Sequence, residues 1–387
     1  MNQLGWVNSA CGHLFPLIIS PFLLLKLGNN ITIYSILLLP LFLSYLFFFK
    51  ILFKKQSSEI KKIALLFILT FFFSIPGILG FYMGNVDIFL SLALGFIILL
   101  KFNEKKLLDK YGKLYSIFMG ILLGAITNAK IFLFPFSVVF ILFSKNIIFK
   151  FFSFLGSFII ITYLPNIFGS PTGILTFLNR VYLWNERVTV NFSPAYNHSP
   201  AALASYFTDC LKTQNCEAYP NNLLTLIIVL LTFVIAFFSR NFFKKKNLVK
   251  LISLLKSPIL YKRYLLKLKT NKYSLIFLLT FITAFINLVP EIAFNYRLYY
   301  SLPIVLILLT ETQNQTKAKF YCYLSMIFLV LGGLWIVNLS PSIKGIIDAR
   351  LMNIFIIFHF IFLIKSSYLL LRSHTSSSIV KYRVQNS

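Results

Sequence analysis

The chain has 387 residues, of which 58% are hydrophobic and 12% are charged, and Phe alone fills 45 positions. A soluble domain of this size could not bury so much apolar surface, so the composition excludes a soluble globular protein. The formal net charge of +27 would suit a nucleic-acid-binding protein. However, the basic residues lie in short loops between apolar runs, as the positive-inside rule describes. We therefore expect a lipid bilayer as the surroundings and no nucleic-acid partner.

The apolar runs are continuous and long enough to cross a bilayer core of about 30 Å. A β-barrel would instead alternate in polarity over about ten residues per strand. The pattern predicts an all-α fold, a polytopic transmembrane bundle of about 11–12 spans, in a single integral membrane domain over residues 1–387. The expected spans are 31–49, 63–82, 85–100, 114–129, 131–144, 147–168, 222–238, 273–290, 298–310, 320–339 and 351–371. The Pro-containing segment 13–27 either adds a span or lies in the interface.

The basic loops give the expected topology. All of them can lie on one face, and the loop over 240–272 is rich in Lys and Arg with no acid. By the positive-inside rule this face is cytoplasmic, and the polar C-terminal tail lies on the same side. We therefore expect a multi-pass protein of a bacterial cytoplasmic membrane with its C-terminus inside.

One long loop, over 169–222, is expected on the outer side. Loops of this length in a compact protein are usually functional or disordered, and the aromatic and apolar residues of this one argue against disorder. It contains Glu186, Asn197 and His198. It also contains Cys210 and Cys216, which either form a disulfide in an oxidising compartment or remain two thiols.

Two polar clusters interrupt the apolar runs on the same expected outer side. Gly84-Asn85-Val86-Asp87 opens one span, and Asn128-Ala129-Lys130 closes another. A carboxylate, amides and an ammonium are costly at membrane depth, so they are candidates for function. Each also has a structural interpretation: Asp87 can cap the helix that follows it, and Lys130 can extend its ammonium to the interface. His359, inside an expected span, is interpreted as a hydrogen-bonded interior residue, and Cys322 as a small core residue.

These clusters resemble glycosyltransferase family 87. The resemblance lies in Gly84-Asn85-Val86-Asp87, a basic turn, a span with Gly120 and Gly124, and Asn128-Ala129-Lys130 leading to Phe134-Pro135. Two further elements resemble the family, His13–Pro21 upstream and Asn197-His198-Ser199 in the long loop, so the similarity covers about residues 13–310. Phe294–Arg297 stands where the family often has Trp-x-His-His, and the family's His is missing there unless Tyr296 or Arg297 takes its place. The resemblance implies the GT-C fold and transfer of mannose or a related sugar from a polyprenyl-phosphate donor to an extracytoplasmic glycan or lipid acceptor.

The resemblance and the chemistry of the donor suggest roles for the candidate residues. Lys130 or Arg297 would hold the donor phosphate, because the enzyme must stabilise charge as the phosphate leaves. Asn85, Asn128, Asn197, His198 and Tyr296 would bind the sugar or the acceptor. A general base is also needed for the acceptor hydroxyl, and the candidates are Asp87, Glu186 and Glu291. No Cys/His spacing suggests a metal, and no cofactor is expected, although a need for a divalent cation is left open.

The chain also departs from the GT-C pattern. These enzymes generally carry a catalytic acid in the first outer loop, but this chain has no acid before Glu59, which is expected to be cytoplasmic. Either the chain begins too late to include the first helix and loop, or it is a degenerate remnant, or another outer acid serves. A lipid or solute transporter is the alternative from another class, and the lack of a convincing internal repeat argues against it.

Overall fold

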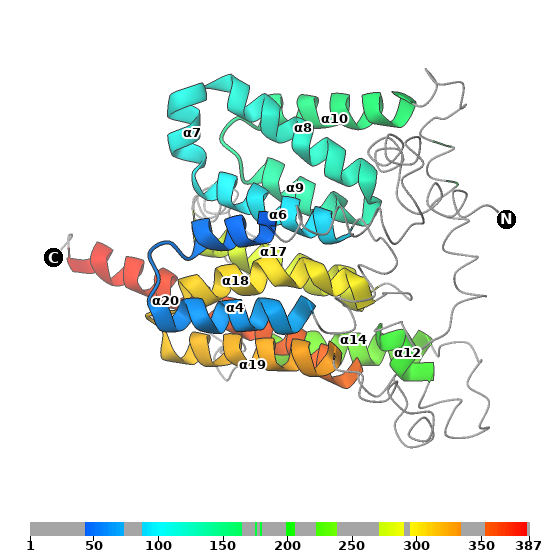
Figure 1. Ribbon diagram of the computed structural model, residues 1–387, viewed down its shortest axis with the longest axis vertical. Coiled ribbons are helices and arrows are strands. Elements are labelled where there is room, and N and C mark those ends of the chain that lie inside the picture. The colour runs from blue at the N-terminus through cyan, green and yellow to red at the C-terminus, as the bar shows by residue number, and fades with distance from the viewer. Residues whose placement is uncertain are drawn as a thin grey trace. The chain divides into compact units, whose positions relative to one another are not determined.

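A computed structural model describes residues 43–72, 87–164, 199–205, 222–237, 271–289, 295–333 and 353–384, together with Leu175 and Asn179. Every regular element in these ranges is helical (Figure 1). The chain forms two compact units, one of Met1–Ile51 with Leu79–Ser193 and the other of Leu52–Ile78 with Pro194–Ser387.

The described part of the first unit begins in helix Leu43–Leu52, whose last residue belongs to the second unit. The labelled elements of the first unit are α6 (Asp87–Phe102), α7 (Glu104–Tyr111), α8 (Lys113–Ala129), η1 (Ile131–Leu133), α9 (Phe134–Leu142) and α10 (Ile147–Tyr163). Gly112, with φ +54°, separates α7 from α8, and glycine adopts that left-handed conformation without steric cost. Pro135 stands in the first turn of α9, where its missing N–H is not needed.

Helices α8 and α10 pack closely because small residues line their contact. A Cβ atom at Gly120 would lie 2.5 Å from the carbonyl oxygen of Lys150, and one at Gly124 would lie 2.6 Å from that of Phe154. Ser153 and Ser157 face the two glycines from α10. Ser157 also donates a hydrogen bond of 3.0 Å to the carbonyl of Ile121. This is the small-residue packing by which helices associate in membranes.

The second unit contains the remaining helices of the described residues. They are α4 (Ser58–Phe72), α12 (Pro200–Ser205), α14 (Asn222–Phe237), α17 (Lys272–Leu288), η5 (Asn295–Tyr300), α18 (Ser301–Glu311), α19 (Thr316–Gly333) and α20 (Asn353–Val384). Helices α19 and α20 lie against each other, and α17 and α14 also contact α20. Figure 1 shows α20 as the long helix that runs out to the C-terminal end.

Buried polar side chains tie α19 to α20. His359 is fully buried, and its Nδ1 lies 2.9 Å from the hydroxyl of Ser325, as the interior interpretation of this histidine predicts. Ser366 donates a 2.8 Å hydrogen bond to the carbonyl of Ala318. Cys322 is buried, which confirms its interpretation as a core residue.

The helices coincide with expected spans but vary in length. Among the described helices, only Asn353–His374 is long and apolar enough by itself to cross a membrane. Shorter apolar helices occupy several other expected spans: Leu43–Leu52, Lys113–Ala129, Ile131–Leu142, Ile147–Tyr163, Leu223–Ala236 and Lys272–Leu288. Large apolar side chains are exposed on them, as on α14 at Leu223 and Leu230. Apolar surface of this extent is typical of contact with a membrane or a partner.

Three features differ from the sequence-based picture. The basic turn after α6 contains an additional helix, α7. Helix α20 continues to Val384, through the Ser-rich segment expected to be a tail. Lys150, expected to face the cytoplasmic surface, is only 1% exposed, because it reaches an acid on α7.

Candidate functional site

Asp87 is the first residue of α6 and is fully buried. A carboxylate in the first turn is favoured by the helix dipole, which agrees with a helix-starting role. The first turn of α6 is held by a side chain of helix Leu43–Leu52. The hydroxyl of Tyr45 donates to the carbonyl of Ile88 at 3.2 Å and contacts the hydroxyl of Ser91. The neighbouring helix therefore holds the start of α6, and with it Asp87, in place.

Lys130 caps the C-terminal end of α8. Its backbone is extended, with φ −148° and ψ 108°, so the chain turns there from α8 into η1. The Lys130 N–H donates to the carbonyl of Ile126 at 3.1 Å, and its carbonyl accepts from Leu133 at 3.0 Å. The residue is 8% exposed, so the ammonium remains inside the protein instead of reaching the interface.

The structure brings together one residue from each of the two sequence clusters, Asp87 and Lys130. Lys130 Nζ lies 3.7 Å from Asp87 Oδ2, and both side chains are buried. This distance permits an ion pair but exceeds that of a direct hydrogen bond. Two buried opposite charges at one end of the packed helices form the candidate site, and their pairing offsets part of the cost of burying each.

Buried polar groups continue along the same end of α8. Asn128 is fully buried and donates from Nδ2 to the hydroxyl of Thr162 on α10 at 2.8 Å. Within the described part of the chain, Asn128 Oδ1 is buried and accepts no hydrogen bond. The hydroxyls of Thr127 and Ser137 lie 2.8 Å apart and join α8 to α9. Buried amide and hydroxyl groups therefore occupy the last turn of α8, just before Lys130.

Arg297 and Tyr296 lie in the second unit, on η5. The following residues anchor this short helix, because Leu298, Tyr299 and Tyr300 are all fully buried. The Tyr299 ring packs edge-on against Phe71 of α4, with centroids 5.0 Å apart. Arg297 is partly exposed next to this fixed segment.

The other predicted site residues lie outside the described residues. They are Asn85, Glu186, Asn197, His198 and Glu291, and Cys210 and Cys216 lie outside as well. Within the described ranges, no group of three or more His, Cys, Asp or Glu side chains could hold a metal ion.

Sequence reasoning missed a second buried charge cluster, centred on Glu104 at the start of α7. One carboxylate oxygen accepts from Lys101 Nζ and the other from Lys150 Nζ. Lys150 also donates to Ser144 at 2.7 Å, and Lys101 donates to the carbonyl of Phe143. The one available signal was an acid three residues after a lysine in a basic turn, which can equally be an exposed helix pair.

The Asp87–Lys130 pair offers a carboxylate for proton transfer and an ammonium for an anionic group, with amide and hydroxyl groups beside it. This chemistry suits transfer of a group from a phosphate. A sequence model of glycosyltransferase family 87 matches residues 14–258, more than half of the chain. The chain belongs to glycosyltransferase family 87.

Membership of family 87 implies a membrane protein with glycosyltransferase activity, acting on a sugar donor and an acceptor. The matched range includes Asp87, Asn128 and Lys130, and it ends before the late element at Phe294–Arg297. Neither the curated proteins nor the solved structures with which the chain was compared gave a match.

Proposed function

We propose that this chain is a GT-C enzyme that transfers mannose or a related sugar from a polyprenyl-phosphate donor to an extracytoplasmic glycan or lipid. The observation that supports this most is the buried Asp87–Lys130 pair, formed by two clusters far apart in sequence and within the family-matched range. In the same proposal, the enzyme lies in a bacterial cytoplasmic membrane with its basic loops and C-terminus inside.

The reaction assigns a separate role to each charge. The acceptor hydroxyl oxygen bonds to C1 of the sugar while the bond between C1 and the phosphate oxygen breaks. The hydroxyl proton passes to the Asp87 carboxylate, and polyprenyl phosphate leaves with the electron pair. Lys130 balances the charge of the leaving phosphate. Electrostatic stabilisation of this kind is usually the largest contribution to the rate enhancement by an enzyme.

The neighbouring groups would orient the sugar. Asn128 has a buried amide oxygen that accepts no hydrogen bond within the described residues, and sugar hydroxyls are donors of the type it needs. Asn85, Asn197, His198 and Tyr296 are proposed to share this binding, and Arg297 to assist at the phosphate. Glu186 and Glu291 are the alternative general bases.

The experiment is a transfer assay in membranes that carry the full chain, with labelled polyprenyl-phosphate sugars and native lipid acceptors. We expect labelled product from the wild type and a loss of at least about a hundredfold in Asp87→Asn and in Lys130→Ala. Asp109→Asn and Lys106→Ala are matched controls, since they remove the same charges from exposed positions on α7, and they should retain activity.

Three results would contradict parts of the proposal. Loss in Glu186→Gln or Glu291→Gln, with transfer retained in Asp87→Asn, would move the general base to that glutamate. Absence of product from folded wild type with every donor would reject transfer and favour a remnant. Movement of a labelled solute across the membrane without any product would favour a transporter.

A further inference from the structure

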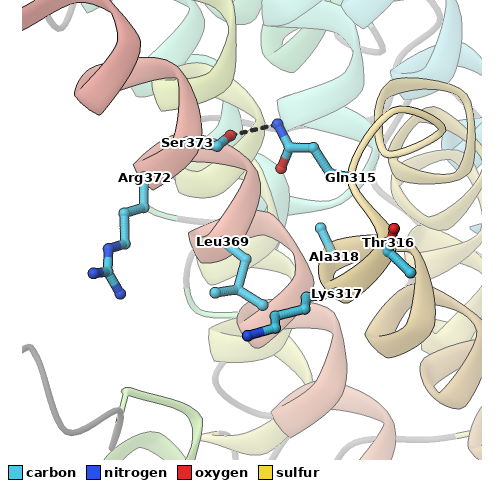
Figure 2. Close-up of a pocket in the computed structure, with 7 residues that line it drawn as sticks. All are labelled: Gln315, Thr316, Lys317, Ala318, Leu369, Arg372 and Ser373. Atoms are coloured by element: carbon cyan, nitrogen blue, oxygen red, sulfur yellow. Dashed lines mark hydrogen bonds between the residues drawn. The ribbon is translucent and has the colours of Figure 1, made fainter. Parts of the chain in front are cut away.

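A basic pocket lies in the second unit, where the turn between α18 and α19 meets α20 (Figure 2). Its volume is about 490 Å³, within the usual range for a small-molecule site. The residues used below are Gln315, Thr316 and Lys317 on one side and Leu369, Arg372 and Ser373 on the other.

Hydrogen bonds hold the two walls of the pocket together. Gln315 Nε2 donates to the hydroxyl of Ser373, which joins the turn to α20 at one end of the pocket (Figure 2). One turn further along α19, Ser366 of α20 donates to the carbonyl of Ala318 at 2.8 Å. The protein's own hydrogen bonds therefore join the two walls of the pocket.

The pocket has the charge and the donors that an anion requires. Lys317 and Arg372 are both exposed, and no acid is among the residues that line the pocket. Glu311, the last residue of α18, forms an ion pair with Lys272 of α17. Thr316 adds a hydroxyl group, whereas the Ser373 hydroxyl already donates to the carbonyl of Leu370 at 2.8 Å. Arg can hold a phosphate with two parallel hydrogen bonds.

The expected spans place both cations near the ends of apolar helices, at the depth expected for lipid headgroups. Lys317 comes just before the span expected at 320–339, and Arg372 comes just before the end of the apolar helix Asn353–His374. Figure 2 shows the Leu369 side chain between those of Arg372 and Lys317, so apolar surface accompanies the charges. A phosphate with an attached acyl chain suits this combination better than a free ion does.

We propose that this pocket binds the phosphate of an anionic phospholipid in the leaflet on the side of the basic loops. The leaflet follows from the proposed topology, and the site takes no part in sugar transfer. Juxtamembrane basic residues are attracted to anionic lipid in this way, and a pocket between helices adds a fixed position for the phosphate.

The test measures lipid retained by the purified full chain. Protein from nanodiscs of phosphatidylcholine and phosphatidylglycerol is examined by native mass spectrometry, and the affinity for each lipid is obtained by titration. We expect preferential retention of phosphatidylglycerol. Lys317→Gln or Arg372→Gln should weaken its binding about fivefold, and the double variant roughly thirtyfold.

Lys319→Gln is the matched control. It removes the same charge from the same helix, but Lys319 Nζ lies 5.7 Å from the Tyr323 ring centroid and does not line the pocket. It should bind phosphatidylglycerol like the wild type, and Lys317→Arg should do so as well. If the double variant does not fold, the single variants decide the question.

Three outcomes would overturn the proposal. The first is equal retention of the two lipids by the wild type. The second is a loss of phosphatidylglycerol binding in Lys319→Gln as large as that in Lys317→Gln, which would indicate attraction by diffuse surface charge. The third is binding of inorganic phosphate in detergent that depends on Lys317 and Arg372 while phosphatidylglycerol binding does not.

Discussion

The first unit buries charge at two places, and the two arrangements differ. Around Glu104, both carboxylate oxygens accept hydrogen bonds directly from lysine ammoniums. At the candidate site, Asp87 Oδ2 and Lys130 Nζ lie 3.7 Å apart. The Glu104 cluster, in which both carboxylate oxygens already accept hydrogen bonds, is suited to holding helices together. The longer Asp87–Lys130 ion pair can admit a substrate group between its two charges. Burial of charge alone therefore does not identify a functional site, because the geometry of the contacts must be considered as well.

The largest effect on stability is expected from Glu104→Gln. The substitution leaves Lys101 and Lys150 buried without their carboxylate, and removing one partner of a buried ion pair costs about 3–5 kcal/mol. Thermal unfolding of the purified protein in detergent measures the loss. Glu59→Gln, at an exposed position on α4, should change the melting temperature little, and Asp87→Asn should impair transfer more than stability.

An equal loss of stability in Glu104→Gln and Glu59→Gln would contradict the structural role of the buried Glu104 cluster. So would a Glu104→Gln protein that keeps wild-type stability but loses transfer, since that would place Glu104 in the chemistry.

A smaller effect is expected from Gly124→Ala. The added Cβ would meet the carbonyl oxygen of Phe154 at 2.6 Å, and overpacking of this kind costs about 1–3 kcal/mol. Because Lys130 directly follows α8 and Lys150 lies on α10, each buried charge site depends on one of these helices, and melting temperature and transfer should fall together. Gly156→Ala is the control, since nothing lies within 4 Å of its added Cβ, and better helix propensity should stabilise it by up to about 1 kcal/mol.

The contribution of Glu104 to the stability of the folded protein should depend on pH. Burial raises the pKa of its carboxyl, but the charges of Lys101 and Lys150 and their hydrogen bonds outweigh burial, so the pKa lies below its ordinary value of 4.5. The stabilisation is therefore complete above that value and is lost as the pH falls through the folded-state pKa. The difference in melting temperature between wild type and Glu104→Gln should shrink on acidification. A constant difference across the acid range would contradict this assignment.

The smallest effect is expected from Thr162→Val, which removes the hydroxyl that accepts from Asn128. Interhelical hydrogen bonds in membrane proteins contribute on average about 0.6 kcal/mol, so the melting temperature should change slightly. Transfer should fall more than stability if Asn128 orients the sugar. Unchanged KM and kcat would contradict that role and leave the bond purely structural.

The sequence predicted the helices better than their contacts. Continuous apolar runs identified most helices, because length and hydropathy decide whether a segment spans a bilayer. Such runs are apolar all round, so they do not indicate which face meets which neighbour. The meeting of Asp87 and Lys130 was foreseeable because both stand at helix ends on the same expected side.

The Glu104 cluster was not foreseeable, for a physical reason. Lys150 lies 46 positions from Glu104, and in the sequence both resemble ordinary residues of basic loops. Only the close approach of α8 and α10, together with the fold of α7, brings the acid to both lysines. Lysine serves both as the loop residue that sets membrane topology and as the buried cation of this cluster, so the sequence alone cannot distinguish the two roles.

Helix α20 is one uninterrupted element of 32 residues, which corresponds to roughly 48 Å at 1.5 Å per residue. The apolar part ends at His374, and a bilayer core is only about 30 Å thick. The residues from Thr375 to Val384 continue the same helix beyond its apolar part. Because the helix is continuous, a tilt of the apolar part would displace the far end by a larger distance, and a label attached there would report that tilt.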